Sequence, residues 1–188
     1  MRVSKLCLTT IVTTCVMLCG SFAYAMTPAQ WHAASQPQRN AWILQWAYQD
    51  NGYVGLNCKQ WPQQRVVPQA SGGAVSVPPT APDANGWYWA PAPYVVQVPL
   101  PYQIAWAQPG WIVQMRIVGT KGVVIPHTAI VANVAITGYN SQTGAAIGTV
   151  TFIDSNWYND NTVRVHSMSF AQFNASLESQ HFTLYYFQ

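Results

Sequence analysis

WIVQMRIVGTKGVVIPHTAIVANV, residues 111–134, carries the strongest fold signal in this chain. Two apolar runs rich in β-branched residues, 111–118 and 123–134, flank the short segment Gly119-Thr120-Lys121-Gly122. β-branched residues favour strands, and a short glycine-containing segment between two such runs is typical of a hairpin. We therefore predict an antiparallel β-hairpin here.

Downstream of the hairpin, the chain continues as a strand-rich segment. Runs at 149–156, 162–166 and 182–187 have the composition of further strands. Between the last two, Ser169 and Gln172 form the pattern of a capping box, which predicts the start of a short helix. Its apolar face consists of Phe170, Phe173 and Leu177.

The segment upstream of the hairpin begins with a helix. From residue 39 to 50, Trp42, Ile43, Trp46 and Ala47 recur at helical spacing, and Asn51-Gly52 follows as a stop. N-terminal helices packed on an antiparallel meander, with a short C-terminal helix and a closing strand, predict the α+β class.

Residues 1–25 have the pattern of a cleaved export signal. Arg2 and Lys5 precede an apolar run at 6–18, and an A-x-A site follows at 23–25. The apolar run is shorter than the roughly 20 residues that a spanning helix needs. We predict cleavage after Ala25, export to the periplasm or the outside, and no stable membrane anchor after cleavage.

Residues 26–188 are predicted to be a single domain with an insertion at about 62–110. Prolines recur from Pro62 to Pro109, and proline breaks helices. The stretch is also rich in tryptophan and tyrosine, which disordered linkers usually lack. We predict an ordered, extended insertion that walls a cleft.

Charge and motif content exclude several classes of function. The full chain has a net charge of +3, to which the signal contributes Arg2 and Lys5, so no basic cluster remains for nucleic acid. The other histidines, His32, His166 and His181, lack the spacing of metal ligands, and we assign them to surface or structural roles. No metal and no cofactor are predicted. The oligomeric state stays open.

Cys58 is the one thiol outside the signal, because the three other cysteines precede residue 20. An unpaired thiol in an exported protein is exposed to oxidation. Cys58 is therefore either a buried small residue or a nucleophile.

A hairpin between 123–136 and 149–156 brings candidate partners for a thiol together. If Ile136 lies opposite Thr149, His127 falls opposite Tyr158, or opposite Asn156 after a slip of two residues. Asp154 and Asn156 share one face of their strand because side chains alternate. A thiolate needs a base such as histidine, and an acid or amide can orient that base.

Four segments of the chain resemble the cysteine, histidine-dependent amidohydrolase/peptidase (CHAP) family in order and character. They are GYVGLNC at 52–58, QPGWIVQ at 108–114, PHTAIV at 126–131 and FIDSN at 152–156. The resemblance implies a papain-like fold of the NlpC-type clan and cleavage of amide or peptide bonds in peptidoglycan. It implies Cys58 as nucleophile, His127 as base, and Asp154 and Asn156 as the orienting groups.

The chain departs from the family pattern at three places. Trp111 stands where the family commonly has aspartate, and Asp154 stands where it usually has glutamate. Pro62 follows the cysteine by four residues, so it removes a hydrogen bond to the Cys58 carbonyl in a helix that starts there. We therefore expect the nucleophile helix to be kinked, short or started differently.

Supporting roles are assigned from position along the chain. Tyr53 and Gln49, upstream of the cysteine, are candidates for the oxyanion site. Four tryptophans are candidates for a substrate groove: Trp61, Trp87, Trp89 and Trp157.

Three functions stay open at this point. The first is an exported cysteine amidase or endopeptidase acting on peptidoglycan. The second is a non-catalytic papain-like module that binds cell-wall glycan or protein. The third is a secreted effector peptidase that shares the chemistry of the first and takes a protein substrate.

Overall fold

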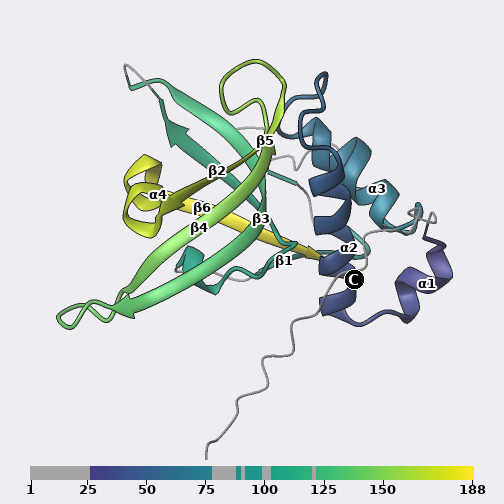
Figure 1. The fold of residues 1–188 in the computed structure, drawn as a ribbon, viewed down its shortest axis with the longest axis horizontal. Helices are drawn as coiled ribbons and strands as arrows, with labels where there is room; N and C mark the ends of the chain where they lie inside the picture. The colour runs from purple at the N-terminus through teal and green to yellow at the C-terminus, as the bar shows by residue number, and fades with distance from the viewer. Residues whose placement is uncertain (1–25, 78–87, 90–91, 99–102, 120–121) are drawn as a thin grey trace, which may run out of the picture.

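The computed structural model describes residues 26–77, 88–89, 92–98, 103–119 and 122–188 (Figure 1). The predicted signal at 1–25, Trp87 and three short stretches of the predicted insertion lie outside the described residues. Six described strands form one antiparallel sheet in the order β1-β6-β2-β3-β4-β5. Helices pack on both faces, so the predicted α+β class is confirmed.

The elements have the following bounds. The strands are β1 Val95–Gln97, β2 Ile112–Val118, β3 Val124–Tyr139, β4 Ala146–Ser155, β5 Val163–Ser169 and β6 Leu177–Phe187. The helices are α1 Pro28–Ala33, α2 Gln36–Gln49, the π-helix η1 Pro62–Val66, α3 Val67–Ala70, the 3-10 helix η2 Ile104–Trp106 and α4 Phe170–Ser176. Within the described part of the chain, no helix is long and apolar enough to cross a membrane.

The central hairpin and the capped C-terminal helix form as predicted. β2 pairs with β3 from Ile112 opposite Ile130 to Val118 opposite Val124. The Ser169 hydroxyl accepts from the Gln172 backbone N–H, and the Gln172 side chain accepts from the Ser169 backbone N–H, which completes the capping box of α4. These short-range signals suffice because each is decided by residues close in sequence.

The pairing of β3 with β4 differs from the prediction by one residue. Ile136 lies opposite Gly148 rather than Thr149, and the register shifts at irregularities after Val131 and Ile136. A bulge adds an unpaired residue to one strand, which alternation alone does not reveal. The strands also extend to Tyr139 and from Ala146, beyond the predicted hairpin segments at 123–136 and 149–156.

Each face of the sheet buries its own core. On one face, strand residues such as Ile112, Ile130 and Ile153 pack against the helices that precede the sheet. On the other face, Val113 and Phe152 belong to a second core that α4 covers. Figure 1 shows α2 and α3 on one side of the sheet and α4 on the other.

The prediction of an extended insertion is wrong for the first residues of that segment. Residues 62–70 are helical, as η1 followed directly by α3, despite Pro62 and Pro68. Val66, Val67 and Ala70 are almost completely buried in the helical core. Burial of this apolar face outweighs the low helix propensity of proline, which is a weak prior once tertiary packing acts.

Gly110 holds α2 against the start of β2. Its φ is +87°, and a Cβ added there would lie 2.4 Å from the backbone oxygen of Asn40 in α2. Both the positive φ and this approach exclude a side chain. We expect Gly110→Ala to lower the free energy of unfolding by about 3 kcal/mol or more, measured by urea denaturation.

Gly138→Ala is the matched control for that substitution. A Cβ added at Gly138 meets no described atom within 4 Å, and Gly138 has no positive φ. We expect a change within about 0.5 kcal/mol. Equal effects of the two substitutions would contradict this account of the α2–β2 contact.

Candidate active site

Cys58 lies in the first turn of a helical segment. The Asn57 side-chain oxygen accepts the backbone N–H groups of Lys59 (3.1 Å) and Gln60 (2.9 Å). The Asn57 backbone oxygen accepts from Trp61 N at 2.9 Å. Asn57 is therefore the N-cap, and Cys58 is the first residue after it. This end of a helix stabilises negative charge.

Pro62 is accommodated by a change of helical spacing. Val67 N donates to the Pro62 oxygen, five residues back, within the π-helical segment η1. Trp61 keeps right-handed helical angles although it precedes a proline. The helix thus starts at Asn57 and widens at the proline. A π-helical turn of this kind is found where a residue disturbs the ordinary hydrogen-bond ladder.

Asp50 anchors this helix to the end of α2. Its carboxylate accepts from the Trp61 indole N–H at 2.9 Å and from two nitrogens of Arg65 at 2.6 and 2.7 Å. Asp50 and Trp61 are buried, so the bond between them is shielded from water, whereas the Arg65 side chain is 34% exposed. The bidentate geometry with Arg65 fixes the direction of the helix as well as its position.

The loop before Cys58 is fastened to the start of β5. Gly52 N donates to Val163 O at 2.9 Å, and Val163 N donates to Tyr53 O at 2.8 Å. At the end of β4, the Ser155 hydroxyl donates to the carbonyl of Leu56. Cys58 is consequently held beside the last residues of β4.

His127 and Asp154 lie where β3 and β4 part. The ladder between these strands ends at Ile130 opposite Ile153, although both strands continue beyond it. His127 Nε2 lies 3.2 Å from Asp154 Oδ2, within ion-pair distance. Cys58 is the second group beside His127, and its interaction contributes to the raised pKa of His127. The structure therefore brings the three predicted residues together.

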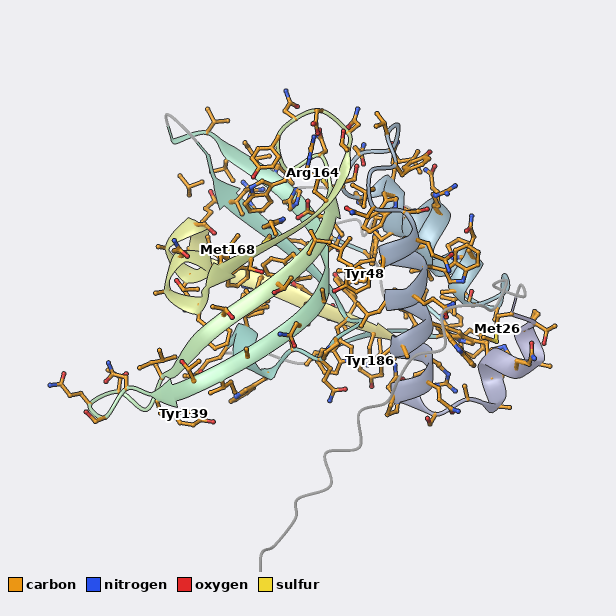
Figure 2. All side chains as sticks on the ribbon, in the orientation of Figure 1. Met26, Tyr48, Tyr139, Arg164, Met168 and Tyr186 are labelled. Carbon is orange, nitrogen blue, oxygen red and sulfur yellow. The ribbon has the colours of Figure 1, made fainter. Side chains whose placement is uncertain are left out.

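Figure 2 helps to locate this cluster. Asp154 is paired with Arg164 of β5, which lies at the opposite end of the sheet from Tyr139 in this view. The cluster is thus at the Arg164 end, close to the helices, and far from the tip of the β3–β4 hairpin.

The surroundings of His127 favour its charged form. Burial lowers the pKa of His127, but hydrogen bonds to Asp154 and Cys58 and the charges of both groups outweigh it and raise the pKa to about 9. Asp154 is completely buried, and His127 is 3% exposed. A positively charged imidazole stabilises a thiolate beside it.

This raised pKa links stability to pH. A pKa of about 9 in the folded state, against 6.5 in the unfolded chain, contributes stability that is fully present below pH 6.5 and is lost as the pH rises through 9. The shift corresponds to about 3 kcal/mol. We expect the free energy of unfolding to fall by this amount between pH 6.5 and 10, measured by denaturant titrations. His181→Ala should retain the fall, and a flat profile would contradict the assignment.

A second histidine contacts Asp154, and the sequence prediction missed it. His166 Nδ1 lies 3.5 Å from Asp154 Oδ2. His166 is opposite Phe152 on the β4–β5 ladder, one diagonal step from Asp154. The short turn between 156 and 162 was the available signal, because it implies an antiparallel pair. We expected only a surface or structural role for His166 and no contact with Asp154.

Trp157 bridges the two histidines. Its ring centroid lies 4.2 Å from that of His166 and 5.1 Å from that of His127, with the second contact edge-on. Trp157 is half-buried, so part of it reaches solvent. Its predicted place in a substrate groove stays a prediction.

Asn156 takes a different place from the one predicted. β4 ends at Ser155, and Asn156 adopts a positive φ of 70° in the following turn. Its side-chain oxygen accepts from Asn161 N at 2.9 Å. We correct the prediction that Asn156 continues the strand face of Asp154: asparagine readily takes this turn conformation, and its oxygen is engaged there.

Two of the predicted groove residues belong to the core. Trp61 is 0% exposed and Trp89 is 1% exposed, so neither lines a groove open to solvent. Large aromatic side chains gain most from burial, which explains their use here. The prediction for Trp61 and Trp89 is therefore corrected.

The two oxyanion candidates lie upstream of Cys58. The Tyr53 ring packs 4.4 Å from the Arg65 guanidinium. Gln49 is an exposed residue at the end of α2. The oxyanion role of both stays a prediction.

Comparison with known proteins gives no relative. No protein-family model, no curated protein and no solved structure matches this chain at a significant level.

Proposed function

We propose that this protein is an exported cysteine hydrolase that cleaves amide or peptide bonds of peptidoglycan. The observation that carries the proposal is that His127 interacts both with Cys58, at a helix N-terminus, and with Asp154, whose Oδ2 lies 3.2 Å from His127 Nε2. A nucleophile, a base and a group that orients the base form the minimal set for acyl transfer.

The proposed reaction has two steps. The Cys58 thiolate attacks the carbonyl carbon, and His127 gives its proton to the departing amine as the C–N bond breaks. Water then attacks the resulting thioester while His127 takes a proton from it, and the carboxylic acid leaves as the thiolate is restored. The backbone N–H of Cys58 is our proposed donor to the oxyanion, because the N–H groups of Lys59 and Gln60 already bond Asn57.

The substrate class rests on the CHAP resemblance and on the predicted export signal. Under the proposal, the fold is a papain-like variant in which the cysteine helix docks at the edge of the sheet that carries the histidine. Trp157 would form one wall of the substrate site beside His127.

The test is digestion of purified sacculi. The mature protein should release fragments whose masses show one added water per cleaved amide bond, with a new amine at the same bond. An unchanged sacculus after long incubation, together with intact stem-peptide substrates, would contradict the proposal.

A non-catalytic binding module is the second candidate, and the burial of the cluster favours it. Cys58 is 5% exposed and His127 is 3% exposed, so both are covered in this conformation. Cosedimentation with sacculi separates the candidates. Binding without any released fragment would support the module and count against the hydrolase.

A further inference from the structure

The Asp154 carboxylate is a buried group with unusual surroundings. Its side chain is 0% exposed, and among the described residues only histidine side chains lie within ion-pair distance of it. A buried carboxylate is costly unless donors compensate it. Two imidazoles approach the same oxygen, Oδ2: His127 Nε2 at 3.2 Å and His166 Nδ1 at 3.5 Å.

The His166 ring is held in place from two sides. Trp157 packs 4.2 Å from its centroid, and Phe152 lies 5.8 Å away, both at tilted angles. Phe152 is also its partner across the β4–β5 ladder. With 14% of its side chain exposed, His166 has little freedom to turn away from Asp154.

We propose that His166 is a positioning residue of this site: its Nδ1–H donates to Asp154 and holds the carboxylate against His127. The inference rests on the proposed function, in which Asp154 orients His127. It adds a fourth member, His166, which acts only through Asp154.

The charge state of His166 supports this role. Burial lowers its pKa, the Asp154 carboxylate opposes that effect, and the charge of His127 lowers the pKa further, with a net decrease. A neutral His166 that faces a carboxylate with Nδ1 must carry its proton there. It therefore supplies a donor without competing with His127 for the negative charge.

Among the described residues, the nearby charged side chains of β5 and β2 have partners other than Asp154. His127 is faced by Asp154 from β4 and by Cys58 from the helix. On β5, the Arg164 guanidinium contacts Asp160, and on β2 the Arg116 guanidinium contacts Glu178. The residue opposite His127 on β2 is the uncharged Met115.

Nuclear magnetic resonance of ¹⁵N-labelled imidazoles in the mature protein tests the proposal without any turnover. In the wild type, His166 should be neutral at pH 7 with its proton on Nδ1. In His166→Leu, the titration midpoint of His127 should fall by about one pH unit, because Asp154 is less well oriented. His166→Asn retains a donor near Nδ1 and should restore the midpoint. His181→Leu is the control and should change nothing.

Two results would overturn the positioning role. One is an unchanged His127 midpoint in a folded His166→Leu variant. The other is a wild-type His166 that is charged at pH 7 or carries its proton on Nε2, which can be read even if the variant does not fold. Failure of the hydrolase proposal alone gives a different result. The His127 midpoint still shifts in His166→Leu, but the wild-type protein cleaves no bond in sacculi.

Discussion

Replacing Cys58 with alanine is expected to abolish hydrolysis, with a loss of about 10⁴-fold or more. The alanine side chain has no nucleophile, and water alone cannot form the thioester. Release of fragments from sacculi, followed by mass spectrometry, measures the effect. Because Cys58 is a small, buried residue that touches His127, alanine fills most of its space and the fold should persist.

Two controls make the Cys58→Ala result decisive. Circular dichroism checks that the variant is folded. Ser167→Ala removes a hydroxyl of similar size from the exposed face of β5, where it contacts Thr151, and should leave hydrolysis unchanged. Equal hydrolysis by the Cys58→Ala variant and the wild type would exclude Cys58 as the nucleophile.

Replacing His127 with alanine is expected to lower the rate of hydrolysis by about 10³-fold. In the proposed mechanism, the imidazole donates the proton to the leaving amine and stabilises the thiolate, so both steps should slow. The same variant leaves Asp154 buried beside an empty space, which should also lower stability. Initial rates on a defined stem-peptide substrate, corrected for the folded fraction, measure the catalytic part.

His32→Ala is the matched control for that experiment. His32 lies in α1 and packs beside Tyr94, away from the cluster. A loss of similar size in both variants would show that the effect is not specific to His127.

The central cluster was predicted from the resemblance of four segments to the CHAP family, and its members also lie close to recognisable local signals. Asn57 and Cys58 follow a glycine-containing turn, and His127 lies on a strong hairpin. Alternation along β4 placed Asp154 on a definite face. These are short-range patterns, so each remains valid when the predicted pairing of two strands is wrong by one residue.

The parts that were missed depend on long-range geometry. His166 reaches Asp154 only through the β4–β5 register, which the sequence does not state. The helix through Pro62 forms because Trp61, Val66 and Val67 become buried in the core that the helices share with one face of the sheet. Asn156 lies outside the strand, because β4 ends at Ser155. Burial overrode a local rule at Pro62, whereas the positions of His166 and Asn156 depend on where the strands pair and end.

Alkylation of Cys58 tests the central claim most directly, because it reports on the thiolate and its partner without a substrate. Iodoacetamide is added to the mature protein at pH 6.5, and the mass of the intact protein is followed with time. We predict one adduct, on Cys58, formed at least about tenfold faster in the wild type than in folded His127→Ala, because a charged His127 stabilises the thiolate. Equal rates in the two proteins would contradict the pairing of Cys58 with His127.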